Sequence, residues 1–219
     1  MKLTERASQR LAGILFLAAF VAYGFGTTLV APLMDAPDST AAVQQGSTKL
    51  VIGCLLMLAN SAIVMGIGLL LRSTLASASK NVANLYLATR VVEGLFLAAG
   101  VFALLSLAFT GDAVSLSHVT FARRANFIGY QVGMLALGLG SLPFCRLLLQ
   151  EHLAPRWLAG WGFMGYAVFA TGALLELLGL SYGLALSIPG GIFELALGVW
   201  LMTKGLGLPR NEVTGKGGP

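Results

Sequence analysis

The sequence predicts an all-α membrane protein, a polytopic bundle of six transmembrane helices with both termini in the cytoplasm. Of its 219 residues, 57% are hydrophobic and only 11% are charged, whereas about a quarter of the residues of a soluble domain are charged. The apolar residues form six runs, each near the roughly 20 residues that cross a bilayer. The basic residues lie mainly in the loops on one side of the predicted membrane, which indicates the orientation of the protein.

The six predicted spans are uniformly apolar, and they are too long for the alternating strands of about ten residues found in membrane β-barrels. A bilayer also requires each spanning backbone to satisfy its own hydrogen bonds, so the runs are predicted to be helices. The spans are Leu11–Leu33, Leu50–Leu71, Leu85–Phe109, Phe127–Leu149, Trp157–Leu178 and Leu184–Thr203. They make one domain, residues 1–204, and residues 205–219 are expected to form a flexible, Gly-rich tail.

The orientation follows from the lysine and arginine residues of the connecting segments. One side carries Lys2, Arg6, Arg10, Arg72, Lys80, Arg146, Arg156, Lys204, Arg210 and Lys216, and the other carries Lys49, Arg123 and Arg124. Short loops rich in lysine and arginine stay in the cytoplasm. Both termini are therefore predicted to be cytoplasmic.

The polar segment Thr110–Asn126 is predicted to lie outside the cell and to carry a short helix on the membrane surface. Arg123 and Arg124 stand at its end, directly before the fourth span. Two arginines at this depth are candidates for binding lipid phosphate groups. The alternative is that they only anchor the helix end at the interface.

Four short blocks carry a family resemblance: Arg10–Leu17, Arg90–Glu93, Leu153–Gly160 and Gly191–Gly205. These blocks resemble a bacterial family of small six-helix membrane proteins that is characterised only as a domain of unknown function. The match is poorest over Thr110–Asn126. The resemblance implies the six-helix fold and a location in the bacterial inner membrane, and it implies no activity.

Charged side chains inside the predicted spans need a physical reason, because each is costly in hydrocarbon, by about 3 kcal/mol or more. There are four: Arg90, Glu93, Glu176 and Glu194. At 1.5 Å per residue, Glu93 lies roughly 12 Å from the cytoplasmic edge and Glu194 roughly 15 Å from the outer edge. Glu176 lies near the outer end of its span, where water can solvate it.

The sequence therefore predicts a polar pocket near the midplane, between the second, third and sixth spans. Its candidate residues are Asn60, Tyr86, Arg90, Glu93 and Glu194. Arg90 is expected to pair with Glu93 or Glu194, which leaves one acid free to hold a proton or a cation. The alternative is an arginine–glutamate clamp that fixes the helix register and binds nothing.

Metal and cofactor sites are not expected. His118 and His152 fall in loops on opposite sides of the membrane, and no span carries paired histidines, which disfavours zinc, di-iron and b-haem sites. No catalytic residue can be assigned, and no nucleotide-binding fingerprint is present. The net charge of +5 is spread over short loops, so no nucleic-acid partner is expected.

Three functions remain. The first is a binding or transport-type protein that takes a small molecule or lipid into the midplane pocket. The second is an accessory subunit whose Gly-rich helix faces pack against a second copy or another membrane protein. The third is an intramembrane enzyme that uses Glu93 or Glu194 as an acid or base. An open cavity that reaches Glu194 favours the first, and a tightly packed interior favours the second. Membrane lipids are expected partners in each case.

Overall fold

The computed structural model describes residues 4–207, and this part of the chain contains helices and turns but no strand. The long helices are α1 (Glu5–Met34), α3 (Ser47–Ala78), α4 (Lys80–Ser106), α5 (Leu116–Gln150), α6 (Arg156–Leu177) and α7 (Gly183–Thr203). The short ones are α2 (Ser39–Gln45) and two single turns of 3-10 helix, η1 (Leu107–Phe109) and η2 (Gly111–Ala113). The all-α prediction is confirmed.

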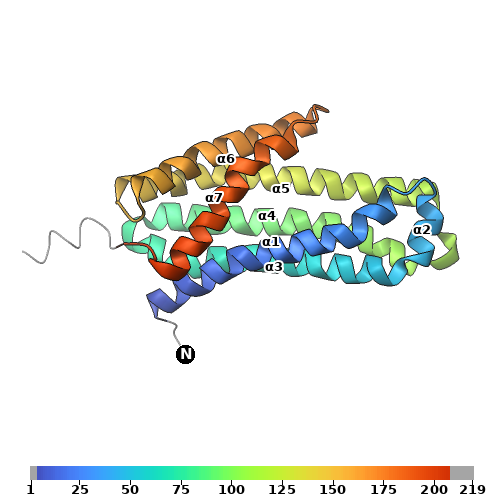
Figure 1. Ribbon diagram of the computed structural model, residues 1–219, viewed down its shortest axis with the longest axis horizontal. Helices are drawn as coiled ribbons and strands as arrows, with labels where there is room; N and C mark the ends of the chain where they lie inside the picture. Colours follow the sequence, from blue (N-terminus) through green and yellow to red (C-terminus); the bar gives the residue numbers. More distant parts are fainter. Residues whose placement is uncertain (1–3, 208–219) are drawn as a thin grey trace, which may run out of the picture.

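Six of these helices are long and apolar enough to span a bilayer, and each coincides with one of the predicted runs. Four runs lie wholly inside their helix, whereas the run Leu85–Phe109 continues from α4 into η1 and the run Trp157–Leu178 ends one residue beyond α6. In Figure 1, α1, α3, α4 and α5 lie lengthwise side by side, and the hairpin of α6 and α7 leans across them. The first and last described residues lie at the same end of the bundle, which we call the terminal end. The opposite end, which carries α2, is called the distal end.

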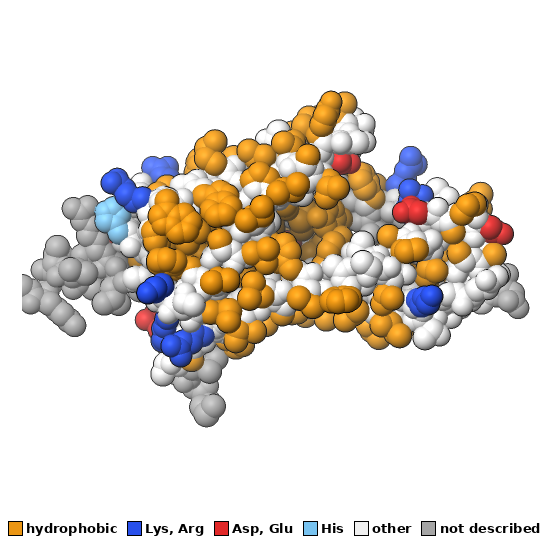
Figure 2. All heavy atoms as spheres, in the orientation of Figure 1, with side chains coloured by type: hydrophobic (Ala, Val, Ile, Leu, Met, Phe, Trp, Pro, Cys, Tyr) orange, Lys and Arg blue, Asp and Glu red, His pale blue; other side chains and the backbone are white. Residues whose placement is uncertain are grey.

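The surface of the bundle is the surface of a membrane protein. Large apolar side chains such as Phe25, Leu69 and Leu95 are exposed along the middle of the helices. Figure 2 shows hydrophobic side chains over the middle of the molecule and the charged side chains gathered toward its two ends. A surface of this kind is suited to lipid, because the exposure of so much apolar area to water is unfavourable.

Four helices begin at a residue whose side-chain oxygen accepts a backbone N–H of the first turn. These residues are Thr4, Asp38, Ser79 and Ser115. Such N-caps satisfy amide groups that the helix itself leaves unpaired. They explain why the helices begin in polar segments well before the apolar runs.

The segment Thr110–Asn126 differs from its prediction. Apart from the single 3-10 turn η2 it holds no separate helix, because α5 begins at Leu116 and continues without a break into the fourth span. Ser115 caps this helix, and neither glycine nor proline occurs between Leu116 and Ile128 to end it. Hydropathy places the start of this helix too late, because its polar first turns extend beyond the hydrocarbon.

Helices α1 and α7 pack closely against each other at the terminal end and diverge toward the distal end. A Cβ atom on Gly13 would lie 2.5 Å from the carbonyl oxygen of Gly198. Farther along α7, a Cβ on Gly191 would reach only the ring of Phe20, at 3.6 Å. The two helices therefore enclose a wedge that widens toward the distal end (Figure 1).

The chain after α7 folds back onto the terminal end of the bundle. The backbone N–H of Leu206 donates to Oε1 of Gln9 at 2.9 Å, and that of Gly207 donates to the carbonyl oxygen of Leu153 at 2.8 Å. The rest of the expected flexible tail, 208–219, lies outside the described residues. So do Lys2, Arg210 and Lys216, which contributed to the predicted orientation.

Candidate functional site

The centre of the bundle holds a buried ion-pair cluster built around Arg90 of α4. Its Nη1 donates to Oε2 of Glu93 at 3.0 Å, and its Nη2 donates to Oε1 of Glu194 at 2.6 Å. The side chains of Arg90 and Glu93 are 1% and 3% exposed. The expected pairing of Arg90 is confirmed, and it involves both glutamates rather than one.

Two tyrosines complete the hydrogen bonding of the guanidinium. Arg90 Nε donates to the hydroxyl of Tyr86 at 3.1 Å, and Nη2 reaches the hydroxyl of Tyr166 at 3.5 Å. Tyr166 in turn donates to Oε1 of Glu194 at 2.8 Å. Four of the five N–H donors of an arginine are thereby used, as a charge buried in a membrane requires.

Aromatic and small residues shape the space around the guanidinium. The ring of Phe16 lies 5.2 Å from the guanidinium carbon, within the range of a cation–π contact. Tyr86 is held by stacking on Phe144, with ring centroids 4.5 Å apart. On α3, Gly68 lets the stem of Arg90 pass, since a Cβ there would lie 2.9 Å from that of Arg90.

A cavity of about 240 Å³ lies beside this cluster, on its distal side, and all six spanning helices line it. Figure 2 shows a hollow with hydrophobic walls near the centre of the molecule, between α7 and α1. This is the wedge that the divergence of the two helices opens. The cavity consequently opens at the side of the bundle, where α1 and α7 diverge.

The polar part of the cavity wall is acidic. Glu93 and Glu194 both line the cavity, whereas Arg90 lies behind them and does not. Each glutamate uses one oxygen on Arg90. Oε1 of Glu93 and Oε2 of Glu194 make no hydrogen bond with the described part of the chain, and neither is sealed off from the cavity.

Asn60 of α3 is a third polar group on this wall. It is buried, at 6% exposure, and it lines the cavity. Within residues 4–207 its side-chain amide makes no hydrogen bond, although its atoms are not sealed from the cavity. No side-chain hydrogen bond of Asn60 therefore joins α3 to another helix in the described structure.

The rest of the wall is apolar and aromatic. Its aromatic members are Phe20 and Tyr23 from α1, Tyr130 from α5 and Phe169 from α6. Tyr23 and Tyr130 stack on each other with ring centroids 5.5 Å apart and bridge the gap between α1 and α5. An apolar pocket with a few convergent polar groups is the usual form of a small-molecule site.

The structure thus brings together Arg90, Glu93, Glu194 and Asn60, as the sequence predicts. Tyr86 belongs to the cluster but not to the cavity wall, because it lies on the far side of Arg90. Sequence reasoning missed Tyr166, Tyr23 and Tyr130. Their positions inside apolar runs were a usable signal, since tyrosines of membrane helices prefer the interface.

The remaining candidates lie elsewhere. Arg123 and Arg124 are exposed near the distal end, and Arg123 pairs with Asp35 at 3.2 Å across α5 and α1. No structural observation tests their proposed binding of lipid phosphate groups. Glu176 accepts the backbone N–H of Gly183 at 2.8 Å and so closes the short turn between α6 and α7.

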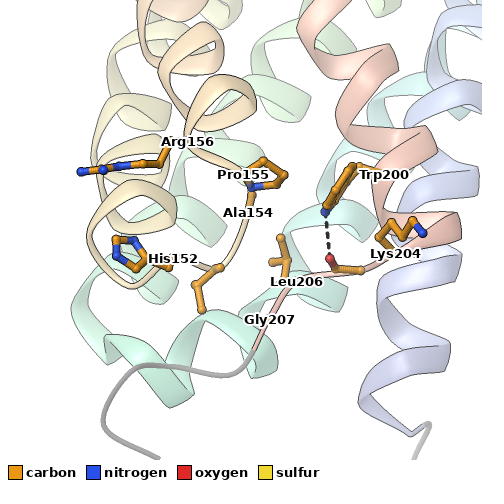
Figure 3. A pocket seen from close by; sticks show the side chains of 10 residues that line it. His152, Ala154, Pro155, Arg156, Trp200, Lys204, Leu206 and Gly207 are labelled. Atoms are coloured by element: carbon orange, nitrogen blue, oxygen red, sulfur yellow. Dashed lines mark hydrogen bonds between the residues drawn. The ribbon is translucent and has the colours of Figure 1, made fainter. Parts of the chain in front are cut away.

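A second hollow, at the terminal end, is rich in basic residues but does not direct them inward. His152, Arg156 and Lys204 are among its lining residues. In Figure 3, Arg156 and Lys204 extend away from each other on opposite sides, and the indole N–H of Trp200 is bonded to the carbonyl of Gly205.

The chemistry of the described site is that of acids, amides and phenols. Across residues 4–207 no group of three or more His, Cys, Asp or Glu side chains is arranged to hold a metal ion. Cys54 and Cys145 are both buried and unpaired with each other. The polar side chains that line the cavity are the carboxylates of Glu93 and Glu194, the amide of Asn60 and the hydroxyl groups of Tyr23, Tyr130 and Ser187.

Comparison with known proteins identifies the family but no activity. No curated protein and no solved structure matches the chain. A family model described as a domain of unknown function (DUF4386) matches residues 11–205. The match spans most of the chain and includes Asn60, Arg90, Glu93, Tyr166 and Glu194. The chain therefore belongs to the DUF4386 family of membrane proteins.

Proposed function

We propose that this protein binds a small amphiphilic molecule, taken from the surrounding membrane into the midplane cavity, as a binding or transport-type protein of the bacterial inner membrane. The observation that carries the proposal is the unpartnered polar wall. Glu93, Glu194 and Asn60 each present free polar atoms to a cavity of about 240 Å³. A clamp that only fixed the helix register would leave no such space beside it.

The energetics support a guest. Polar groups that face a cavity without a protein partner need water or a guest to complete their hydrogen bonds, because leaving such groups unpaired costs roughly 1–3 kcal/mol each. If these positions served only the stability of the fold, apolar side chains of similar size would give a more stable protein. The three groups converge on one cavity, so a guest with one polar end and an apolar body would satisfy them together.

The lateral wedge supports entry from lipid. The close crossing at Gly13 and Gly198 closes the α1–α7 seam at the terminal end. Beyond it, the seam is lined by Ala19, Phe20 and Gly24 from α1 and by Ser187 and Gly191 from α7. These small and apolar residues suit the passage of an apolar body. With the predicted orientation, the guest would enter from the outer half of the bilayer.

Two probes of similar shape test the proposal. The neutral probe is para-fluorobenzyl dimethylcarbinol, and the basic probe is para-fluoro-N,N-dimethylbenzylamine. Each is titrated into the purified protein in lipid nanodiscs, and fluorine NMR separates bound probe from probe dissolved in lipid. We expect at least one probe to give a saturable signal with one site per protein.

A matched pair of glycine variants locates the signal. Gly191→Leu places a side chain in the cavity, starting from ordinary contact with the ring of Phe20. Gly160→Leu adds the same atoms at a position with nothing within 4 Å, away from the cavity. Binding should be lost in Gly191→Leu and kept in Gly160→Leu. If neither probe binds, or if both variants bind as the wild type does, the proposal is wrong.

A further inference from the structure

The charges on the cavity wall are unequal. Glu93 and Glu194 face the cavity, and Arg90, their shared partner, is 1% exposed and lies behind them. Two carboxylates against one guanidinium leave a formal excess of one negative charge. No other charged side chain of the described residues lines the cavity.

The position of the free oxygens directs this charge at a guest. Glu194 accepts from Arg90 and Tyr166 on one and the same oxygen, Oε1. Its other oxygen, like Oε1 of Glu93, makes no hydrogen bond with the described residues. A carboxylate oxygen only accepts hydrogen bonds when ionised. The side of the cavity formed by Glu93 and Glu194 therefore favours a hydrogen-bond donor that carries positive charge.

The aromatic residues that line the rest of the cavity also favour a cation. The rings of Phe20, Tyr23, Tyr130 and Phe169 surround the cavity from three helices. The face of an aromatic ring attracts a cation, and aromatic cages are the usual recognition element for alkylated ammonium groups. An anion would be repelled by the two carboxylates, so the cavity disfavours carboxylate and phosphate groups.

We propose that the guest is an organic cation, a small lipophilic amine in its ammonium form, whose charged nitrogen lies between the free oxygens of Glu93 and Glu194. Its apolar part fills the aromatic half of the cavity. The cavity has room for about eight waters by liquid volume, so the bound group is a single ring or a short branched chain. This inference rests on the proposed binding function and names its substrate class.

The two fluorinated probes test the inference, because they share the para-fluorobenzyl group and a branched end of similar size and differ in charge. At neutral pH the amine carries a proton and the carbinol is uncharged. We expect the amine to bind the wild type roughly tenfold more tightly than the carbinol, or better, from its added charge and cation–π contacts. The anionic analogue para-fluorophenylacetate should give no saturable signal.

Variants of equal charge assign the preference to the cavity. Glu194→Gln and, independently, Glu93→Gln should reduce the preference for the amine to about twofold or less, within the scatter of neutral contacts. Glu151→Gln removes the same charge outside the cavity, at the terminal end of α5. It should leave the preference unchanged.

The outcomes separate the two proposals. If the carbinol binds as tightly as the amine, and Gly191→Leu still abolishes binding, the cation inference is overturned and the binding function stands. If the amine is preferred equally in the wild type, Glu194→Gln and Glu93→Gln, the assignment to these carboxylates is overturned. If neither probe binds, both proposals fail.

Discussion

Arg90 is the residue on which the packing of the polar centre depends. It joins α4 to α7 through Glu194 and also contacts Tyr166 of α6. Without it, two carboxylates would face each other in a nonpolar environment, where like charges repel strongly and neither is solvated. Its removal should therefore destabilise the protein more than the removal of either acid.

Replacement of Arg90 by alanine tests this directly. We expect Arg90→Ala to lower the free energy of unfolding in detergent by about 3–5 kcal/mol, as is typical when one member of a buried pair is removed. Glu194→Gln should have a smaller effect, because it keeps the shape and the hydrogen bonds of the side chain and leaves Arg90 with Glu93. Thermal unfolding of the purified variants measures both. Equal and negligible losses would show that the cluster does not stabilise the bundle.

Tyr166 is predicted to hold Glu194 in place. Its hydroxyl donates to Oε1 of Glu194 at 2.8 Å. Because hydrogen bonds to charged groups contribute about 1.5–3 kcal/mol, Tyr166→Phe should destabilise the protein by about that amount. Tyr182, at 61% exposure, supplies the control. Tyr182→Phe should change the unfolding temperature little, and a similar loss in both variants would contradict the assigned bond.

The part of the site that the sequence predicts is the part that is costly in lipid. Arg90, Glu93 and Glu194 stand out because a charge in hydrocarbon must be paired. Tyr166, Tyr23 and Tyr130 were missed because a phenol carries no such penalty and because its role depends on the rotation of its helix about the axis. Spacing along one helix does not determine which face meets which neighbour.

At the scale of the helices, the close crossing of α1 and α7 controls the shape of the wedge. Any side chain at Gly13 would meet the backbone of Gly198 and the side chain of Met202. Small residues at such positions let membrane helices approach closely, and packing is a main source of their association. The crossing therefore sets the angle at which α7 leans away from α1.

A bulkier residue at this crossing should be destabilising. Gly13→Val forces the two helices apart, and overpacking of this kind typically costs about 1–3 kcal/mol. Gly24→Val, about three turns farther along α1, meets nothing within 4 Å and should change the stability by less than about 0.5 kcal/mol. Thermal unfolding compares the two. Equal stability would mean that α1 and α7 do not depend on this contact.

The apolar runs predict the six long helices well, because a spanning backbone has few alternatives to a helix. They predict the helix ends poorly. Hydropathy marks the hydrocarbon boundary, whereas Ser115 begins α5 by capping its first turn. The lean of the α6–α7 hairpin was equally beyond a sequence-based prediction, because it depends on contacts between residues such as Gly13 and Gly198 that lie far apart in the chain.

At the scale of the whole molecule, the lean of the hairpin and the buried charge work together. The wedge opens the midplane to lipid on one side, while the four lengthwise helices shield it on the other (Figure 1). On the proposed function, this opening is the route by which the guest reaches the carboxylates. The geometry of the bundle does not determine which end faces the cytoplasm. The orientation is instead predicted by the basic residues of the loops at the terminal and distal ends.

The orientation is predicted by the basic residues and can be measured with single cysteines. Asn81, at the start of α4, is exposed at the terminal end, and Ser117, at the start of α5, is exposed at the distal end. Neither substitution by cysteine changes a charge. The native Cys54 and Cys145 are 0% exposed and should not react while the protein is folded.

An impermeant maleimide applied to intact spheroplasts should label Ser117→Cys and leave Asn81→Cys unlabelled, because lysine- and arginine-rich short loops remain in the cytoplasm. After lysis, both variants should react, which controls for folding and accessibility. The reverse pattern would place the terminal end outside. It would also move the wide part of the wedge to the inner half of the bilayer, so that the guest would enter from the cytoplasmic leaflet.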